Sequence, residues 1–220
     1  MSPSIAEVTV REYQYLDTQR HEILPYLPDS VRRLLDVGCG YGGFGAFVRE
    51  TRGAEVWGIE PNSGAAEQAS RRLDHVIQAT VEAASGVPDG SFDAVTFLDV
   101  LEHLVDPWAV LAAGRRWLRQ GGIVVASVPN VRYWPVVKEY VYRGSWHYTT
   151  TGVLDRTHLR FFTRSSLGEL FQEAGYAVQR IEGINAMRYR KLALLDFLLG
   201  GRLDEMRYMQ LVGVGRPREK

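Results

Sequence analysis

A carboxylate followed closely by glycines is the first pattern in this chain that could bind a ligand. Asp36 precedes Gly38, Gly40 and Gly43, which fit the spacing G-x-G-x-x-G, and Glu60 follows about 20 residues later. Glycines at this spacing allow a tight turn into a helix whose first N–H groups point at a bound nucleotide, and the later acid can bind ribose hydroxyls. Asp36 would repel a pyrophosphate, but it would attract a nucleoside ligand with a cationic tail.

Histidines form the second group of residues that could do chemistry, because a neutral imidazole can take a proton from a hydroxyl group near neutral pH. Among the five histidines, His103, His147 and His158 follow the predicted fourth or fifth strands, at the edge of the sheet where ligands bind, and His103 and His158 are the candidates. Either could be a general base, and either could instead form only structural hydrogen bonds in a loop. Asp155 and His158 have a spacing found among metal ligands, but the chain has a single cysteine, Cys39, and no second cluster, so we expect no metal.

The elements that must position these residues alternate between strands and helices. Apolar runs predict strands at 33–37, 55–59, 74–78, 92–98 and 123–128, and the segments between them predict helices at 42–52, 62–72 and 107–119. Such alternation indicates a parallel sheet with right-handed crossovers. The rest of the chain predicts helices at 131–143, 164–174 and 187–199, strands at 176–184 and 208–214, and a short helix at 16–24 that Pro25 ends.

Several motifs resemble those of class I S-adenosylmethionine-dependent methyltransferases. The run from Leu34 to Gly40, LLDVGCG, resembles their first motif, and Ile59-Glu60-Pro61 resembles their second. Residues 90–95 and 99–104 resemble the region of the fourth strand, and residues 118–122 resemble the turn into the fifth. The resemblance implies an α/β fold, a Rossmann-like, doubly wound, seven-stranded sheet with helices on both faces. The sheet would be mostly parallel, with the last strand antiparallel between the fifth and the sixth.

The resemblance also implies that S-adenosylmethionine is the cofactor, and it assigns the contacts by position. The methionine end would contact three residues of the first motif: Asp36, Gly38 and Gly40. Glu60 would bind the ribose hydroxyls, and Asp99 would lie near the methionine portion or the acceptor. Thr80 stands where the family often has an acid that binds adenine, so adenine recognition is expected to differ here.

The acceptor is indicated by the second half of the chain. Residues 155–163 resemble a segment of sugar- and polysaccharide-associated methyltransferases, and the chain also resembles ubiquinone-biosynthesis-like O-methyltransferases. This resemblance implies direct displacement of the methyl group by a hydroxyl of a sugar or a related small metabolite. His158 or His103 would be the general base, the latter in a Glu102-His103 pair that resembles one in small-molecule methyltransferases. Six aromatic residues between positions 133 and 148 would either form a wall of the acceptor pocket or cover the sheet.

Length favours one domain over residues 1–220. Within it, residues 1–30 would form a helical lid in which Tyr13 and Tyr15 cover the ligand or pack on a helix face. Residues 131–162 and 186–204 would be insertions that form the acceptor pocket or an interface. Lysine plus arginine equals aspartate plus glutamate at 26 each, so no overall field favours nucleic acid as a partner.

The chain contains no run of ~20 apolar residues and no secretory signal at its N-terminus, so we expect a cytoplasmic protein without stable membrane insertion. The apolar run at 192–199 is too short to span a bilayer. It is expected to pack on the sheet or on a second subunit, which leaves a homodimer open, rather than to dip into a lipid surface.

Two other functions stay open at the level of sequence. An NAD(P)-dependent oxidoreductase shares the glycine pattern and Glu60, but Asp36 opposes a pyrophosphate and the chain shows no catalytic half to go with it. A regulatory or scaffold protein could bind the cofactor without turnover. The departure at Thr80 keeps this second alternative open.

Overall fold

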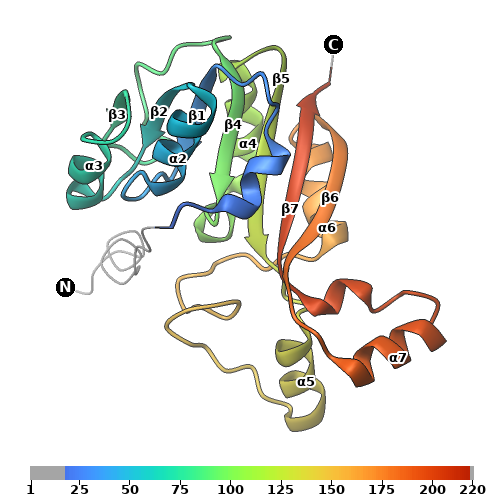
Figure 1. Ribbon diagram of the computed structural model, residues 1–220. Helices are drawn as coiled ribbons and strands as arrows, with labels where there is room; N and C mark the ends of the chain where they lie inside the picture. Colours follow the sequence, from blue (N-terminus) through green and yellow to red (C-terminus); the bar gives the residue numbers. More distant parts are fainter. Residues whose placement is uncertain (1–17, 219–220) are drawn as a thin grey trace.

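A computed structural model describes residues 18–218, without the side chains of residues 190, 191, 193 and 194. Its centre is one seven-stranded sheet in the order β3-β2-β1-β4-β5-β7-β6 (Figure 1). The strands are β1 (Arg33–Val37), β2 (Glu55–Ile59), β3 (His75–Ile77), β4 (Phe92–Leu98), β5 (Leu118–Pro129), β6 (Tyr176–Ala186) and β7 (Tyr208–Pro217).

Strands β1 to β5 pair in parallel, whereas β7 pairs antiparallel with both β5 and β6. This arrangement confirms the predicted doubly wound sheet with its last strand between the fifth and the sixth. The strand order reverses between β1 and β4, so the carboxyl ends of these two strands flank a crevice in which ligands of open α/β sheets bind.

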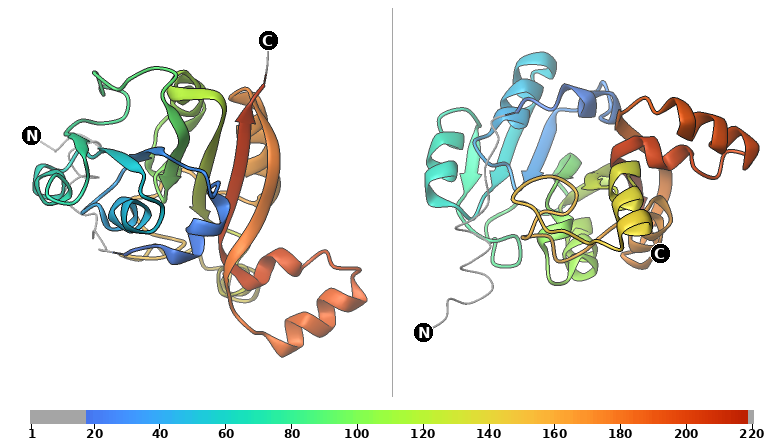
Figure 2. Two further views of the ribbon diagram at one scale, coloured as in Figure 1. Left: turned by 45° about the horizontal axis from the view of Figure 1, so that its top comes forward. Right: turned by 90° about the horizontal axis from the view of Figure 1, so that it is seen from below.

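Helices cover both faces of the sheet, as predicted. The α-helices are α2 (Gly43–Arg52), α3 (Ser63–Ala69), α4 (Pro107–Gly114), α5 (Trp134–Arg143), α6 (Arg164–Glu173) and α7 (Arg190–Leu198). Helix α2 and the 3₁₀ helix η1 (His21–Tyr26) lie on one face, and α4 and α6 lie on the other (Figure 2). Neighbouring residues of β1 show why both faces need cover, because Leu34 belongs to the apolar cluster under α2 and Leu35 to the cluster under α4 and α6.

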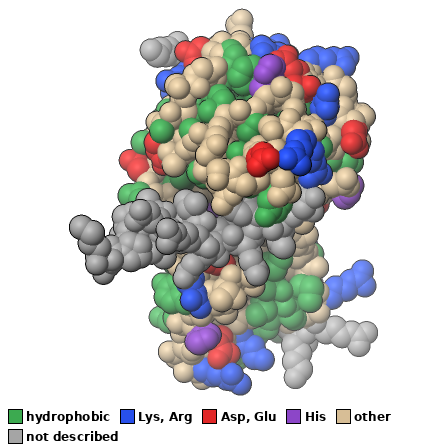
Figure 3. Space-filling model, turned by 90° about the vertical axis from the view of Figure 1, so that its left-hand side faces the viewer, with side chains coloured by type: hydrophobic (Ala, Val, Ile, Leu, Met, Phe, Trp, Pro, Cys, Tyr) green, Lys and Arg blue, Asp and Glu red, His purple; other side chains and the backbone are tan. Residues whose placement is uncertain are grey.

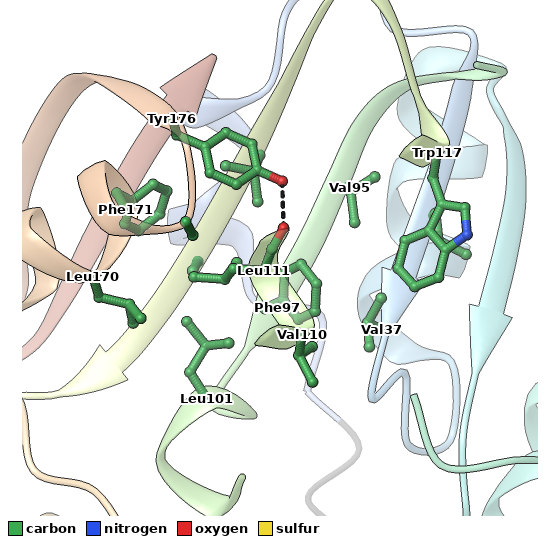
Figure 4. Close-up of a cluster of buried hydrophobic side chains, with 14 of the residues drawn as sticks. Val37, Val95, Phe97, Leu101, Val110, Leu111, Trp117, Leu170, Phe171 and Tyr176 are labelled. Atoms are coloured by element: carbon green, nitrogen blue, oxygen red, sulfur yellow. Dashed lines mark hydrogen bonds between the residues drawn. The ribbon is translucent and has the colours of Figure 1, made fainter. Parts of the chain in front are cut away.

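The larger cluster, under α4 and α6, holds the biggest fully buried side chains of the described chain (Figure 4). Trp117 and Phe97 are buried there, and Phe171 packs edge-to-face on Tyr176 with 5.9 Å between ring centroids. The hydroxyl of Tyr176 donates a hydrogen bond to the carbonyl oxygen of Leu111 at 2.9 Å. This bond ties β6 to α4 and satisfies a polar group that would otherwise be costly to bury.

Local capping signals place two helix starts where the sequence predicts them. The Asp106 side chain accepts a hydrogen bond from the Ala109 N–H, and Pro107 follows it at the first helical position. Thr163 and Ser166 form a reciprocal capping box at the start of α6. The predicted end of the helix at 107–119 is wrong, because α4 stops at Gly114 and residue Leu118 already pairs with β4 as the first residue of β5.

The first described helix also differs from its prediction. The predicted α-helix ending before Pro25 is instead a 3₁₀ helix that contains Pro25 and ends at Tyr26. Two hydrogen bonds at its ends, Ile23 N–H to Arg20 O and Leu27 N–H to Leu24 O, define this short turn. The missing N–H of Pro25 therefore interrupts no long helical ladder. Tyr13 and Tyr15 lie outside the described residues.

A second lobe extends beyond the carboxyl edge of the sheet and contains α5, the loop that follows it, and α7 (Figure 1). Helix α5 has no buried residues, and Tyr140, Tyr142 and Tyr148 are exposed. Trp146 is also exposed, and its ring packs edge-to-face on Phe161, with 5.3 Å between ring centroids. These exposed rings do not cover the sheet, so that predicted role is wrong for them. The other predicted role, as a wall of the acceptor pocket, stays a prediction.

The apolar run at 192–199 is buried only in part. Leu192 is buried, but Leu195, Phe197 and Leu198 are exposed, so the prediction that the run packs on the sheet is wrong for these three residues. Figure 3 shows the face that lies on the left-hand side in Figure 1, and hydrophobic side chains gather on the lower part of this face. Among the described residues, no helix is both long and apolar enough to cross a membrane.

Candidate functional site

A cavity of about 730 Å³ opens where the sequence predicts a ligand, at the carboxyl ends of β1 and β4. Residues 18–22 line one side of it, and the glycine turn and Asp36 line another. The rest of the wall includes Asp99, which follows β4, Asn185 of β6 and Gln210 of β7. The cavity therefore joins segments from both ends of the described chain.

The glycine turn has the predicted geometry. Gly38 and Gly40 have φ angles of 73° and 53°, values that residues with a Cβ rarely adopt. A Cβ on Gly38 would also collide with the side chain of Val100. The turn leads into α2 at Gly43, so the unpaired N–H groups at this helix start lie beside the cavity.

Asp36 lies in this cavity with its carboxyl group almost fully buried. Parallel register places Thr96 directly beside it, and the Thr96 hydroxyl donates a hydrogen bond to Asp36 Oδ1 at 2.6 Å. Burial raises the pKa of Asp36 to about 7, although the Thr96 bond and the nearby Arg20 charge both favour the ionised form. A cation bound beside Asp36 would favour ionisation further. The sequence reading identified Asp36 but not Thr96.

Glu60 lies behind the glycine turn rather than on the cavity wall. Its carboxylate is buried and accepts hydrogen bonds from the Gly40 N–H at 2.9 Å and the Asn62 N–H at 2.8 Å. These two bonds hold the turn against the end of β2. Thr80 is exposed and does not line this cavity. The predicted roles of Glu60 toward ribose and Thr80 toward adenine stay predictions.

Asp99 is the centre of a polar network at the other side of the cavity. Arg20 forms an ion pair with it, with 2.5 Å between Nη1 and Oδ2, and Gln210 Nε2 donates to Oδ1 at 2.8 Å. The Ser127 hydroxyl donates to Oδ1 at 3.2 Å. Asp99 was predicted, whereas Arg20 and Gln210 were missed because no local pattern distinguishes them from other polar residues. The Asp99 carboxylate and the Arg20 guanidinium therefore place both signs of charge in the cavity.

Backbone strain marks the same cavity. Three non-glycine residues between positions 18 and 218 have positive φ angles: Arg20 at 46°, Asp99 at 56° and Asn185 at 56°. All three line the cavity. Each such conformation costs on the order of 1 kcal/mol or more and persists only where the surrounding structure enforces it. Their coincidence on one cavity wall supports the interpretation of this cavity as a functional site.

The two candidate histidines meet next to Asp99, although they are far apart in sequence. Their rings pack edge-to-face with centroids 4.8 Å apart. His103 Nδ1 lies 3.2 Å from the Thr157 carbonyl oxygen, and His158 Nδ1 lies 3.1 Å from the Val153 carbonyl oxygen. Burial lowers the pKa of His103 to about 4 and also lowers the pKa of His158, so both rings are neutral near neutral pH.

Glu102 is a further member of this group that the sequence reading did not assign a role. Its side chain is 1% exposed, and burial raises the pKa of its carboxyl group well above the usual range. The Glu102 main chain also anchors the loop that carries His158, since its carbonyl oxygen accepts the N–H groups of Leu159 and Arg160. His103, His158 and Glu102 do not line the cavity, but Asp99, which does, contributes to the electrostatic field at all three side chains.

Cys39 lines the cavity as a buried thiol, and burial raises its pKa. A thiol that stays protonated is a poor nucleophile, which fits the interpretation of Cys39 as a packed turn residue.

The fold is a doubly wound sheet with a glycine turn, and the cavity wall contains three carboxyl groups, those of Glu22, Asp36 and Asp99, together with the guanidinium of Arg20. These features define a nucleotide-binding α/β domain. The chain belongs to the methyltransferase domain family, whose sequence model matches residues 10–181. The nicotinamide-dependent alternative is therefore set aside.

Comparison with known proteins gives relatives and a shared fold. A ubiquinone biosynthesis O-methyltransferase of Psychrobacter arcticus is 34% identical over 170 residues, which are 70% of this chain and 62% of the relative. The enzyme of the same name from Chromobacterium violaceum is 32% identical over 182 residues, 74% of this chain and 76% of the relative. A crystal structure of a SAM-dependent methyltransferase from Archaeoglobus fulgidus has a TM-score of 0.63 at 17% identity, over 96% of this chain and 94% of that chain. This structure shares the fold.

S-adenosylmethionine is the cofactor that family membership implies, and the cavity residues fit it. The cofactor carries a cationic sulfonium and ammonium group and an anionic carboxylate. Asp36 and Asp99 are suited to the cationic groups, and Arg20 is suited to the carboxylate. The backbone of the turn at Gly38 and Gly40 forms part of the cavity wall.

Proposed function

We propose that this chain catalyses transfer of a methyl group from S-adenosylmethionine to a hydroxyl oxygen of a small acceptor, a sugar or a related hydroxylated metabolite. The observation that carries the proposal is the cavity, whose wall contains the Asp36 and Asp99 carboxyl groups and the Arg20 guanidinium that pairs with Asp99. Transfer to oxygen is supported by the O-methyltransferase names of the relatives. A sugar acceptor is supported by the resemblance of residues 155–163 to sugar-associated methyltransferases.

The bound cofactor would supply an electrophilic methyl group, so the residues of the chain mainly align the acceptor and exclude water. Arg20 would bind the cofactor carboxylate while it retains one contact to Asp99, and Asp36 would face the cationic groups. Glu60 would hold the glycine turn in place and accept hydrogen bonds from the ribose hydroxyls.

A hydroxyl acceptor must also lose a proton, and we assign this role to the histidine pair. His158 donates through Nδ1 to the Val153 carbonyl oxygen, so Nε2 carries the free lone pair of the neutral ring. Its lowered pKa keeps this ring neutral and able to accept a proton near neutral pH. His103 is the competing base, since its ring contacts that of His158.

Three structural expectations complete the proposal. Residues 1–30 act as a lid, a role supported by the part from Thr18 to Glu22 that lines the cavity. The insertions at 131–162 and 186–204 bind the acceptor or form an interface. Phe197 and Leu198 would make contact in a homodimer, because both are apolar and exposed. A cytoplasmic location remains a prediction from the sequence.

The decisive experiment incubates the protein with methyl-labelled S-adenosylmethionine and a panel of hydroxylated acceptors, and identifies the products by mass spectrometry. The expected result is label on an acceptor oxygen. Tight binding of the cofactor in calorimetry without label on any sugar, phenol or amine would favour the regulatory alternative. Label on nitrogen or carbon alone would overturn the assignment to oxygen.

A further inference from the structure

Gln210 contacts the centre of the charged network in the cavity. It lies on β7, and its Nε2 donates hydrogen bonds to both oxygens of Asp99, at 2.8 Å and 3.0 Å. A side-chain amide has a donor end and an acceptor end. Turning the amide over would set Oε1 against the Asp99 carboxylate, and two acceptors repel each other. The direction of the Gln210 amide therefore matters as much as its place.

Asn185 holds the other end of this amide from the neighbouring strand. Its Nδ2 donates a hydrogen bond to Gln210 Oε1 at 2.6 Å, and β6 pairs antiparallel with β7 at this point. Asn185 is exposed at the cavity and has a φ angle of 56°, which is unfavourable for a residue with a Cβ. The strained backbone thus coincides with a bond that fixes the direction of the Gln210 amide.

Asp99 connects the amide to Arg20. Four hydrogen bonds, from Gln210, Ser127 and Arg20, reach the two Asp99 oxygens, and a carboxylate has about four lone-pair sites. The Asp99 and Arg20 side chains are only 23% and 14% exposed, so water competes little for these bonds. A carboxylate held from several sides keeps its plane, and the guanidinium bound to it keeps its place.

The Arg20 guanidinium retains donors for a ligand. Of its five N–H groups, that of Nε donates to Glu22, one on Nη1 donates to Asp99 and one on Nη2 donates to Ser127. The other two N–H groups, one on each terminal nitrogen, have no partner within residues 18–218. Arg20 lines the cavity, so these two donors are available to the cofactor carboxylate there.

We propose that Gln210 is a positioning residue for the amino-acid end of S-adenosylmethionine, and that Asn185 holds its amide in the required direction. The Gln210 amide fixes the Asp99 carboxylate, and Asp99 in turn holds the Arg20 guanidinium where it binds the cofactor carboxylate. Neither Gln210 nor Asn185 needs to touch the cofactor. The inference rests on the roles proposed above for Asp99 and Arg20, but it does not depend on the acceptor.

The test compares two nucleosides that differ in the amino-acid end, with the full chain and no acceptor. S-adenosylhomocysteine carries the ammonium and carboxylate groups, whereas 5′-methylthioadenosine has neither. Calorimetry of the wild type should show tighter binding of S-adenosylhomocysteine. Gln210→Ala should weaken this binding about tenfold, close to the lower end of the value of a hydrogen bond to a charged group. Its affinity for 5′-methylthioadenosine should stay within about twofold of the wild type, which also shows that the variant folds.

Asn185→Gly is the sharper variant, because glycine suits the φ angle of 56° and removes the amide donor at the same time. Relief of the strain should offset the greater flexibility of glycine in the unfolded chain, so the melting temperature should stay close to that of the wild type. Affinity for S-adenosylhomocysteine should fall about two- to tenfold, the value of a neutral hydrogen bond. A purely structural role for Asn185 would not lower affinity without lowering stability.

A matched control is Gln179→Ala, because Gln179 is an exposed glutamine elsewhere on β6, with Nε2 3.5 Å from the Ala177 carbonyl oxygen. This change should leave the affinity for both nucleosides unaltered. An equal loss for both nucleosides in Gln210→Ala, or wild-type affinity of this variant for S-adenosylhomocysteine, overturns the positioning role of Gln210. Wild-type affinity of Asn185→Gly for S-adenosylhomocysteine overturns the role of Asn185.

The two nucleosides also separate this inference from the proposed function. No acceptor takes part, so failure to methylate any sugar or related metabolite would overturn the proposed reaction and leave the selective loss in Gln210→Ala as support for the positioning role. A wild type that binds both nucleosides with equal affinity would overturn the positioning role even if the protein methylates an acceptor.

Discussion

The cofactor cavity and the outer lobe are built on different principles. Asp36 on the cavity wall and Glu60 behind the glycine turn are nearly fully buried, and Glu60 accepts hydrogen bonds from two backbone N–H groups. In the outer lobe, α5 has no buried residue, and Tyr142 and Phe197 are 73% and 80% exposed. The packing of the sheet thus fixes the donor site, whereas side chains of the lobe can change with little cost in stability. We therefore expect the residues that determine which acceptor is methylated to lie in the outer lobe.

The histidine cluster joins these two regions. His103 belongs to the short helix that follows β4, and His158 belongs to the loop of the outer lobe. The Glu102 carbonyl oxygen accepts the N–H groups of Leu159 and Arg160, and the Phe162 carbonyl oxygen accepts the N–H group of Val131, so the loop is tied to the segments that follow β4 and β5. A change in the cluster should therefore affect turnover without altering the donor site.

The largest expected effect tests this separation. His158→Ala should lower the rate of methyl transfer at saturating cofactor by about 10²–10⁴-fold, since an acceptor hydroxyl would lose the group that activates it. Cofactor affinity in calorimetry should be nearly unchanged. In the wild type, burial lowers the pKa of His158, so the rate should fall with decreasing pH only below the ordinary histidine range near 6.5.

The control for this prediction is His103→Ala, which removes the competing base. If His158→Ala keeps the wild-type rate and its decline in acid while His103→Ala loses both, the base is His103. His158 would then only order the loop.

The second prediction concerns the donor side and its dependence on pH. Burial raises the pKa of Asp36 to about 7 in the cofactor-free protein, so a cationic ligand must displace a proton below that pH. Cofactor affinity should fall about tenfold per pH unit below pH 7 and stay constant above it. Calorimetry in buffers of different ionisation enthalpy measures the proton released, and Asp36→Asn should abolish the slope. An unchanged slope in this variant would assign the proton to another group.

The raised pKa of Asp36 also makes the stability of the folded protein depend on pH, with a sign opposite to that of a salt-bridged carboxylate, whose pKa is lowered. The raised pKa of Asp36 means that the folded, cofactor-free protein holds a proton that the unfolded chain releases. Its contribution to stability is present below pH 4 and is lost between about pH 4 and pH 7. Saturating cofactor should remove part of this loss.

A third prediction is smaller and concerns the glycine turn. Glu60→Ala should weaken cofactor binding by roughly 1.5–3 kcal/mol, the value of hydrogen bonds to a charged group, because the turn and the ribose hydroxyls both lose an acceptor. Glu60→Gln should lose less, since one amide oxygen remains. Isothermal titration of the folded variants gives the difference. Normal binding by Glu60→Ala would show that Glu60 serves neither the turn nor the ribose.

The smallest effect compares two tyrosines, one from each region. Tyr176→Phe removes the hydroxyl that binds the Leu111 carbonyl oxygen in the core, and should cost about 1–3 kcal/mol of unfolding free energy (Figure 4). Tyr142→Phe in the exposed lobe should change stability by less than about 0.5 kcal/mol. Urea denaturation of both variants provides the measurement. Equal costs would contradict the difference in packing between the two regions.

The sequence by itself determined the features that depend on neighbouring residues. The glycines after Asp36 adopt the predicted turn, and Thr163 caps α6 as predicted, because backbone conformation and capping are set within a few positions. Alternating strands and helices sufficed for the layered sheet, since parallel strands require crossovers of a fixed hand. The end of α4 was missed because Leu118 pairs with β4, which the local pattern does not show. The extent of η1 was missed because a short 3₁₀ helix can contain Pro25.

Only the tertiary structure decided which distant side chains share a site. Arg20 lies 79 positions from Asp99, and Gln210 lies 111 positions from it, so no local spacing could connect them. His103 contacts Thr157 across 54 positions, which also brings it to His158 and places Glu102 beside both. These contacts depend on where the loops leave the sheet, and that is fixed by packing and register over the whole domain rather than by the residues that meet.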